Sequence, residues 1–294
     1  MKKYGRDFKE PFYGIEACLF RQEEDVSHLV REARARGFAI GVHFPLRAGR
    51  SRLRDALFLS RHDRVREDAF ERIREELEYL VRVKPKYVLF HYPKPVVLDD
   101  RVDWSAWRFA DREEYVFESE YGPHEFFERS EFLFQWLSIK SDEYGFTPVL
   151  EFDALNRYVY ETDCLENLLK TYDKIKVCLD IGRLHLQDMI DPFFGARRVI
   201  DNYAKYAEVI HLWNFRYRGN VEHYRHPVLP ELSPQDGWAP VEQYLKIVRA
   251  ENKNVKILFE HRSDLVSDED LERCYEWVYE LWNGGRYGEN IGVL

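Results

Sequence analysis

Six short apolar segments of this sequence each end on a histidine, an aspartate or a glutamate. These residues are His43, His91, Glu151, Asp180, His211 and Glu260. Imidazole nitrogens and carboxylate oxygens together bind divalent transition metals such as Zn, Mn, Fe and Co. A lone carboxylate is costly to bury unless a cation or hydrogen-bond donors meet it, and a metal would neutralise several carboxylates at once. The set therefore predicts a metal centre.

Each of these residues taken alone has a simpler explanation. A histidine or carboxylate at the end of a strand usually satisfies local hydrogen bonds. Asp180, in KVCLDIGRLHL, fits a helix N-cap or the start of a turn. The metal hypothesis depends on six such residues at the same position in six apolar segments.

The apolar segments have the length and composition of strands that are buried on both faces, as in a parallel sheet. We expect strands at residues 13–20, 38–43, 87–91, 148–152, 177–180, 209–213 and 255–260. Between them, apolar residues recur with helical spacing. The expected helices cover residues 23–36, 67–83, 126–140, 165–172, 196–206, 241–250 and 268–282. This alternation predicts an α/β fold with a parallel sheet.

The length of 294 residues suits one (β/α) TIM barrel with long loops, and no linker-like segment divides it. We therefore expect a single domain over residues 1–294. Seven strands are clear. An irregular eighth would come from the first eleven residues or from the tail NIGVL, unless the barrel is incomplete. In a barrel the carboxyl ends of the strands meet at one mouth, which would bring the six polar residues together.

Composition limits the class of protein. The net charge of −9 and the pI near 5.7 argue against a nucleic-acid partner, because duplex affinity depends on neutralised phosphates. No apolar segment resembles a signal peptide or reaches the roughly 18 residues of a membrane span. The four cysteines form no CxxC pair and are expected to be free thiols, which fits the cytoplasm. An oligomer is compatible with these features, which do not specify one.

The chain resembles the xylose isomerase-like TIM barrels, a superfamily of sugar isomerases and epimerases, inosose dehydratase-like enzymes and endonuclease IV. The resemblance is carried by VLEFD, CLDIG, IHLWN and LFEHR, which occur in the family's order. It implies one divalent metal (Mn, Zn, Co, Fe or Mg) held by Glu151, Asp180, His211 and Glu260. It also implies that Glu151 and Glu260 act as the acid–base pair. His43 in VHFP and His91 in FHYP match two histidines that help bind an additional metal in endonuclease IV.

Two departures from the family pattern concern the metal and the substrate. Arg183 stands where family members usually carry a histidine, with His185 two residues further on. The Asp-Arg-His triplet of endonuclease IV here reads Tyr224-Arg225-His226. With Arg183 in place of a histidine and Tyr224 in place of an aspartate, two of the three ligands of its third metal are missing. Arg183 adds a fixed cation, which favours a different or anionic substrate.

Further residues near the strand ends are candidates for substrate binding. They are Lys94, Arg183, His185, Trp213, Arg216 and His226. The loop after His43 carries seven arginines between residues 47 and 66, which either form a solvated face or reach an acidic group of the substrate. The aromatic-rich segment 99–122 is expected to be a long loop, either a lid or simply packed onto the barrel.

These features favour a metal-dependent isomerase or epimerase of a sugar or sugar derivative. One glutamate would remove a proton next to a carbonyl to give an enediolate, and the other would return it. The alternatives are an endonuclease IV-like phosphoesterase, favoured by His43 and His91, and an inosose dehydratase-like lyase. A barrel that only binds a ligand is a third, which the pair Glu151 and Glu260 argues against. We expect a small sugar-like substrate and no membrane partner.

Overall fold

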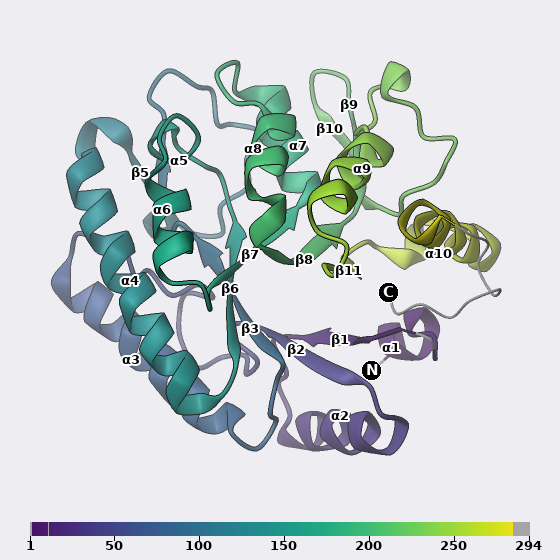
Figure 1. Cartoon of the computed structure of the whole chain (residues 1–294), viewed down its shortest axis with the longest axis horizontal. Coiled ribbons are helices and arrows are strands. Elements are labelled where there is room, and N and C mark those ends of the chain that lie inside the picture. The colour runs from purple at the N-terminus through teal and green to yellow at the C-terminus, as the bar shows by residue number, and fades with distance from the viewer. Residues whose placement is uncertain (1, 11, 285–294) are drawn as a thin grey trace. The chain divides into compact units, whose positions relative to one another are not determined.

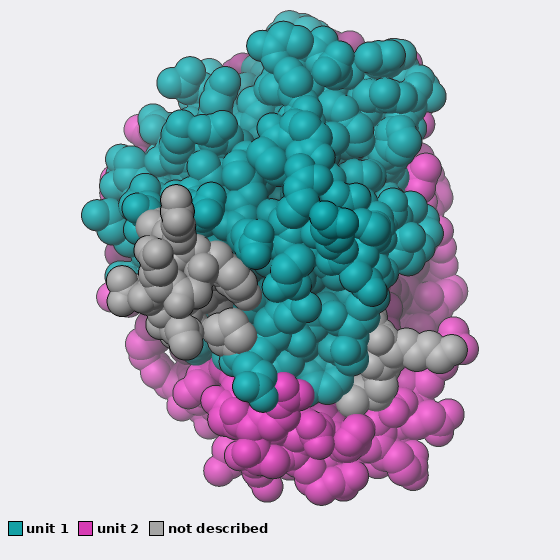
Figure 2. Space-filling model, turned by 90° about the vertical axis from the view of Figure 1, so that its right-hand side faces the viewer, with its two compact units in different colours: residues 1–13, 178–294 teal, residues 14–177 magenta. Residues whose placement is uncertain are grey.

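The computed structural model describes residues 2–10 and 12–284 of the chain. The chain forms two compact units, which Figure 2 shows in different colours. Unit 1 comprises residues 1–13 and 178–294, and unit 2 comprises residues 14–177. The expectation of a single domain over residues 1–294 stays a prediction.

Unit 2 consists of parallel strands that alternate with helices. Its strands are β1 (Gly14–Ala17), β2 (Ala39–His43), β3 (Tyr87–Tyr92), β4 (Val96–Leu98), β5 (Tyr115–Phe117) and β6 (Thr147–Phe152). Its helices are α2 (Glu23–Arg36), α3 (Asp63–Leu80), α4 (Pro123–Tyr144), α5 (Arg157–Tyr160) and α6 (Cys164–Thr171). β1, β2, β3 and β6 are neighbours in that order and pair in parallel, so their carboxyl ends lie at one edge.

The core of unit 2 explains why polar side chains gather at this edge. The sequence of β3, YVLFHY, is buried at every position, as expected for a strand covered on both faces. α3 and α4 lie side by side (Figure 1). The ring of Phe70 in α3 packs against those of Phe132 and Trp136 in α4. The register of β3 and β6 places His91 opposite Glu151. Paired residues point to the same face of a sheet, so these two side chains are brought together.

The segment 99–122 has more regular structure than the expected long loop. It contains η1 (Arg112–Glu114), β5 and η2 (Glu118–Glu120), and β5 pairs in parallel with β4. Trp104 packs against Trp107, and Phe109 against Tyr115, with ring centroids 6.0 and 4.5 Å apart. These aromatic residues therefore pack against one another, and a lid role for the segment stays a prediction.

Unit 1 continues the alternation and adds a hairpin. Its strands are the last part of β7 (Lys176–Asp180), β8 (Ala207–Leu212), β9 (Asn214–Tyr217), β10 (Val221–His226) and β11 (Lys256–Phe259). Its helices are α1 (Lys2–Asp7), α7 (Ile181–Ile190), α8 (Ala196–Tyr203), α9 (Val241–Glu251) and α10 (Asp268–Asn283), with short turns η3 (Ala204–Tyr206), η4 (Pro234–Asp236) and η5 (Ser263–Leu265). β7, β8 and β11 are neighbours in that order, and β8 pairs with β11 in parallel. β9 and β10 form an antiparallel hairpin after β8 (Figure 1).

All seven predicted strands are present, with small shifts at their ends. An eighth strand does not form at the described amino-terminal residues, because Lys2–Asp7 is the helix α1. The tail NIGVL lies outside the described residues. Of the two explanations offered for Asp180, a helix N-cap and the start of a turn, the structure shows the N-cap, because α7 begins directly after it. The helix α7 and the hairpin of β9 and β10 have no counterpart among the predicted elements.

The cysteines are free thiols, as predicted. Cys178 is buried in β7, whereas Cys18 lies just beyond β1 and is exposed, although the predicted strand included it. Within the described ranges, the helices are all too short or too polar to cross a membrane.

Candidate functional site

In unit 1, three of the predicted ligands converge from three different elements. Asp180 ends β7, His211 lies in β8, and Glu260 follows β11 directly. Their ligand atoms lie within 4.8 Å of one another. Asp180 and His211 are fully buried, and the Glu260 side chain is 19% exposed. The strand ends of unit 1 therefore gather nitrogen and oxygen donors, as the sequence predicts.

Asp180 is also the N-cap of α7. Its Oδ1 accepts a hydrogen bond from the backbone N–H of Arg183 at 2.9 Å, and its Oδ2 lies 3.4 Å from the Nε of the same arginine. A carboxylate at a helix N-terminus is stabilised by the N–H groups of the first turn and by the helix dipole. The helix-capping explanation is therefore confirmed, and it leaves room for a second role because the cap uses Oδ1.

Glu260 is held by Arg225, a residue outside the predicted site. Nη2 of Arg225 lies 2.8 Å from Oε1 of Glu260. Arg225 has a positive φ of 59° at the irregular part of the β9–β10 ladder, and such irregularities re-aim side chains. Burial by itself lowers the pKa of Arg225, but the charge of Glu260 outweighs it and raises that pKa. The available signal was the triplet Tyr224-Arg225-His226, which shares its arginine and its histidine with the Asp-Arg-His triplet of endonuclease IV.

Trp213 is fully buried against the first turn of α7. A Cβ atom on Gly182 would lie 2.2 Å from Cε2 of Trp213, so a larger residue does not fit there. The indole also meets the ring of Tyr224 at 4.9 Å in an edge-on arrangement. Trp213 therefore fixes the start of the helix that Asp180 caps, and its predicted role as a wall of the substrate pocket stays a prediction.

His185 lies in α7 but has a structural partner. Its Nδ1 is 3.2 Å from the hydroxyl of Tyr244, and its ring lies against Phe215. Burial lowers the pKa of His185 to about 4, so the imidazole is neutral at pH 7. Its contacts are with aromatic residues of unit 1 rather than with the three ligands.

Arg216 and His226, the remaining candidates of unit 1, belong to the hairpin. Arg216 forms a cross-strand ion pair with Glu222, with Nε 2.7 Å from Oε2. His226 packs on the ring of Trp238 at 5.2 Å. The ion pair joins the two strands of the hairpin, and the ring contact packs the hairpin against the later segment that carries Trp238. Substrate binding by Arg216 and His226 stays a prediction.

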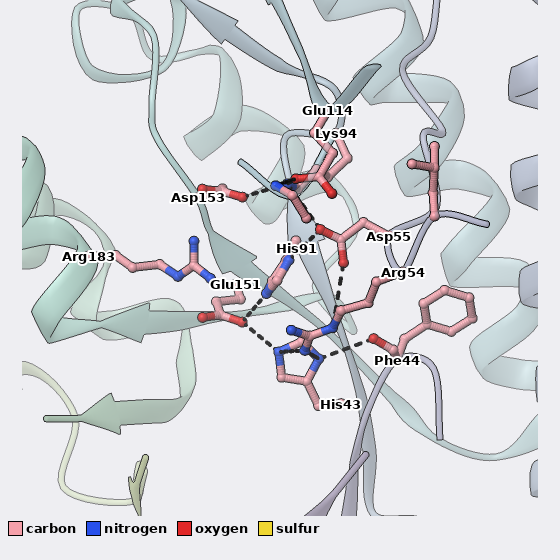
Figure 3. A network of polar contacts seen from close by, with 12 residues as sticks. His43, Phe44, Arg54, Asp55, His91, Lys94, Glu114, Glu151, Asp153 and Arg183 are labelled. Atoms are coloured by element: carbon pink, nitrogen blue, oxygen red, sulfur yellow. Dashed lines mark hydrogen bonds and ion pairs between the residues drawn. The ribbon is translucent and has the colours of Figure 1, made fainter. Parts of the chain in front are cut away.

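In unit 2, the other three predicted residues also meet at the strand ends (Figure 3). Oε2 of Glu151 lies 3.1 Å from Nε2 of His43 and 3.1 Å from Nε2 of His91. The two imidazole rings meet edge to face at 4.8 Å. All three side chains are buried, and their ligand atoms lie close enough together to hold a metal ion.

Behind His91 lies a group of charged side chains of which only Lys94 belongs to the predicted site. Nδ1 of His91 is 2.8 Å from Oδ2 of Asp55. The ammonium of Lys94 lies 3.0 Å from the same oxygen, 2.9 Å from Oδ2 of Asp153 and 3.5 Å from Oε2 of Glu114 (Figure 3). Lys94, a candidate for substrate binding, is 2% exposed and makes its contacts with these carboxylates.

Two of these carboxylates differ in how far the sequence could have predicted them. Asp153 lies two residues after Glu151 in VLEFD, directly after the predicted strand 148–152, so its position near the site could have been predicted. Asp55 lies in the arginine-rich loop, where its contacts depend on how the loop folds back onto β3.

The cluster of unit 2 shifts the titration of its own members. Burial by itself lowers the pKa of His91, but the charges of Asp55 and Glu151 outweigh it and raise that pKa to about 9. Burial lowers the pKa of His43. Burial by itself raises the pKa of Asp55, but the neighbouring cations hold it well below its usual range. At neutral pH His91 is therefore a cation whose Nδ1 donates to Asp55 and whose Nε2 forms an ion pair with Glu151, while His43 is neutral.

The arginine-rich loop is largely committed to ion pairs within unit 2. The pairs are Arg47 with Glu76 at 2.7 Å, Arg52 with Asp111 at 2.6 Å, Arg61 with Glu125 at 3.2 Å and Arg66 with Asp63 at 2.6 Å. Arg54 differs, because its Nη2 lies 3.1 Å from Nε2 of His43. Arg54 is therefore the arginine of this loop that reaches the Glu151 cluster.

No protein-family model matches this sequence, and no curated protein matches it. Solved structures do match. A D-tagatose 3-epimerase-like protein is 15% identical over 97% of this chain and 93% of its own, with a TM-score of 0.63. L-ribulose 3-epimerase is 14% identical over 90% and 76% of the two chains, with a TM-score of 0.56. The IOLI protein with a bound zinc atom is 12% identical over 90% and 84%, with a TM-score of 0.55.

At this level of identity, the likeness establishes the fold. The protein has the (β/α) TIM-barrel fold of the xylose isomerase-like type, as its sequence predicts. Seven strands of the main sheet lie in the described residues.

Proposed function

We propose that this protein is a divalent-metal-dependent isomerase or epimerase that acts on a sugar or a sugar derivative. The observation that carries the proposal is the convergence of Asp180, His211 and Glu260 in unit 1. The likeness to a tagatose 3-epimerase-like protein, to a ribulose 3-epimerase and to a zinc-holding protein supports the same class.

The spacing of these ligand atoms fits a metal ion. Nδ1 of His211 and Oε2 of Glu260 are 3.7 Å apart, which is longer than a hydrogen bond. An ion held tetrahedrally at about 2.1 Å from each ligand atom would separate two such atoms by roughly 3.4 Å. An imidazole combined with carboxylates suits Zn, Mn, Co or Fe, and Mg would retain more water.

Glu151 is the proposed fourth ligand, an assignment that rests on its match to the metal-binding glutamate of the family motif. When bound, the ion would polarise the carbonyl and hydroxyl oxygens of a sugar. The proposal therefore assigns to the ion the charge stabilisation that proton removal next to a carbonyl requires.

Glu151 and Glu260 are the proposed proton-transfer residues. One accepts a proton from the carbon next to the sugar carbonyl, and the other delivers a proton to the same or the neighbouring carbon. Glu260 is oriented by Arg225 through Oε1, and Glu151 is oriented by His43 and His91 through Oε2. These contacts hold both carboxylates in one orientation before a substrate arrives, which lowers the entropic cost of reaction.

Two arginines are the proposed contacts for an acidic group on the substrate. Arg183 lies beside Asp180, and its side chain is 18% exposed. Arg54 lies beside His43, and its side chain is 35% exposed. A guanidinium binds phosphate and carboxylate through two parallel hydrogen bonds, so a phosphorylated or acidic sugar is the substrate class we favour.

The test is proton exchange in deuterated water with a panel of ketoses, sugar acids and sugar phosphates. The purified protein, loaded with Mn, Co or Zn, should incorporate deuterium at a sugar carbon, and a chelator should stop the exchange until metal is restored. The proposal fails if elemental analysis finds no metal, added metals do not raise the melting temperature, and no sugar exchanges.

A phosphoesterase of the endonuclease IV type is a second candidate, favoured by the cluster of His43, His91 and Glu151. Arg183 and Tyr224 argue against it, because an arginine has no lone pair to offer a third metal. Abasic-site DNA in the same panel separates the two candidates: incision much faster than turnover of every sugar would favour the phosphoesterase.

A dehydratase would use the same residues as the isomerase and differ in its product. If a hydroxyl group leaves after proton removal, the product has lost water. Mass spectrometry of the product from any sugar that exchanges deuterium distinguishes this outcome from epimerisation.

A further inference from the structure

Lys94 is the most completely buried cation in contact with the cluster of unit 2. It is 2% exposed, and three carboxylates surround its ammonium: Asp55 at 3.0 Å, Asp153 at 2.9 Å and Glu114 at 3.5 Å. Burying a lysine costs several kcal/mol unless its charge is well compensated. Burial by itself lowers the pKa of Lys94, but the carboxylates outweigh it and raise that pKa above its ordinary value. The ammonium is therefore charged, and its donors point at oxygens.

The backbone of Lys94 is also held in place. Its carbonyl oxygen accepts a hydrogen bond from the N–H of Leu59 at 2.8 Å. This bond ties the turn after β3 to the segment that carries Asp55, so both members of the Lys94–Asp55 pair are positioned by the same contact.

A continuous set of contacts leads from Lys94 to Glu151 (Figure 3). Oδ2 of Asp55 lies 3.0 Å from the ammonium of Lys94 and 2.8 Å from Nδ1 of His91. Nε2 of His91 lies 3.1 Å from Oε2 of Glu151. Because Oδ2 of Asp55 contacts both the ammonium of Lys94 and Nδ1 of His91, the position of the ammonium affects the position of the imidazole.

The same place has the ligand set of a metal site. The ligand atoms of Asp55, His91 and Asp153 lie within 4.8 Å of one another. The ammonium of Lys94 contacts the two carboxylates of this set, so the cation here belongs to the chain itself. Unlike a metal ion, it is not removed by a chelator.

We propose that Lys94 is a positioning residue that takes the place of a structural metal ion. Through Asp55 it orients the ring of His91, and through His91 it orients Glu151. This role rests on the proposed function of Glu151 as a proton-transfer residue. The alternative is that Lys94 only balances the charge of three buried carboxylates and that His91 would keep its orientation without it.

The readout is the Nδ1 proton of His91 in protein labelled with 15N-histidine, assigned by its loss in His91→Gln. An Nδ1 proton bonded to a fixed carboxylate is shifted downfield and exchanges slowly with water, so it reports the orientation of the ring. This signal does not depend on turnover, so it judges Lys94 even if no sugar is a substrate.

The main variant is Lys94→Met combined with Asp153→Asn, which removes one charge of each sign and keeps the side-chain volumes similar. We expect the Nδ1 signal of His91 to be lost, or its exchange to be at least tenfold faster. Asp153→Asn alone should retain the signal because Asp55 and Lys94 remain. Lys174→Met, which removes a surface lysine paired with Asp142, is the matched control and should change nothing.

Activity provides the second readout if a sugar exchanges deuterium with the wild type. The double variant should lose about ten- to hundredfold in kcat, as is usual for residues that orient a site through another residue, with KM changed less than about twofold. A folded double variant with an unchanged His91 signal would overturn the proposal.

If the double variant does not fold, Lys94→Met combined with Glu114→Gln decides the matter. It also removes one charge of each sign and leaves Asp55 in contact with His91. Loss of the His91 signal supports the proposal, and an unchanged signal overturns it. Failure of every sugar, with the His91 signal behaving as expected, would count against the proposed function alone.

Discussion

The two polar clusters differ in how their carboxylates are compensated. In unit 2, Glu151 lies 3.1 Å from two imidazoles, and a buried ammonium stands behind one of them. In unit 1, His211 and Glu260 stand 3.7 Å apart, and Arg225 contacts the other oxygen of Glu260. In the first cluster a buried imidazolium and a buried ammonium lie among the carboxylates. In the second, the cations are the more exposed arginines Arg225 and Arg183, and the ion that we propose there would add to them. Similar residues at strand ends can therefore serve either arrangement, and the surrounding charges decide which.

Two buried histidines also show that the surrounding charges decide, in this case for the pKa of an imidazole. His91 is 7% exposed and His185 is 5% exposed, yet the pKa of His91 is raised to about 9 and that of His185 is lowered to about 4. His91 lies between carboxylates, while His185 faces the neutral hydroxyl of Tyr244. Equal burial thus leads to opposite charge states, because the neighbours differ.

The largest expected effect tests whether each unit supplies one proton-transfer residue. Glu260→Gln and Glu151→Gln should each reduce deuterium exchange into the substrate by about 10²- to 10⁴-fold, because a neutral amide neither accepts nor returns a proton. Glu242→Gln and Glu166→Gln, which alter surface glutamates paired with lysines, are the controls for the two units. Full exchange in either active-site variant would remove that glutamate from the mechanism.

The second largest effect is on the number of metal ions bound per chain, which should depend on the cluster of unit 1 and not on that of unit 2. His211→Asn should weaken metal binding more than about hundredfold, since it removes a direct ligand. His91→Asn should leave one ion per chain, because its cluster is already compensated by hydrogen bonds and Lys94. Elemental analysis after dialysis measures both. A wild type with two ions, of which His91→Asn loses one, would show instead that unit 2 also holds a metal.

Arg225 should have a smaller effect than the ligands. Arg225→Met removes a charge-assisted hydrogen bond worth about 1.5–3 kcal/mol, which corresponds to a loss of about ten- to hundredfold in kcat. Arg218→Met, which removes an exposed arginine from the turn of the same hairpin, is the matched control. Equal losses in steady-state kinetics for both variants would show that hairpin stability, and not the orientation of Glu260, is responsible.

The smallest effect concerns stability and pH. The ordinary pKa of 6.5 for histidine is lowered to about 4 for His185 by burial, so the unfolded chain takes up a proton at higher pH than the folded chain. The contribution of this group to the free energy of unfolding therefore falls by up to about 3 kcal/mol as the pH drops from 6.5 to 4.

Urea unfolding at pH 7 and pH 4.5 measures this effect. The loss on acidification should be smaller in His185→Gln than in the wild type, and unchanged in His124→Gln, which removes a surface histidine. The same loss in all three proteins would show that His185 does not couple acid to unfolding.

The strands were predictable because their signal is local. Apolar runs such as YVLFH must be buried on both faces, and a polar residue at the end of each run marks the strand end. α7 was missed because Ile-Gly after Asp180 resembles a turn. Gly182 is required there by the indole of Trp213, a contact with a residue that is distant in sequence. Helical spacing alone does not reveal a glycine that is kept for packing.

The six strand-end residues and the fold class follow from the order of residue types along the chain, because burial patterns repeat with the period of each element. The residues that these six side chains contact do not follow from the sequence in this way. His91 and Asp55 are 36 residues apart and meet because β3 and the loop after β2 come together in the folded unit. The sequence predicts Lys94 as a substrate contact and shows Arg225 only as part of a triplet, and in neither case does it reveal the carboxylates that the two cations contact. Hydrogen bonds and ion pairs act over a few ångströms, so only the folded chain decides which charges compensate one another.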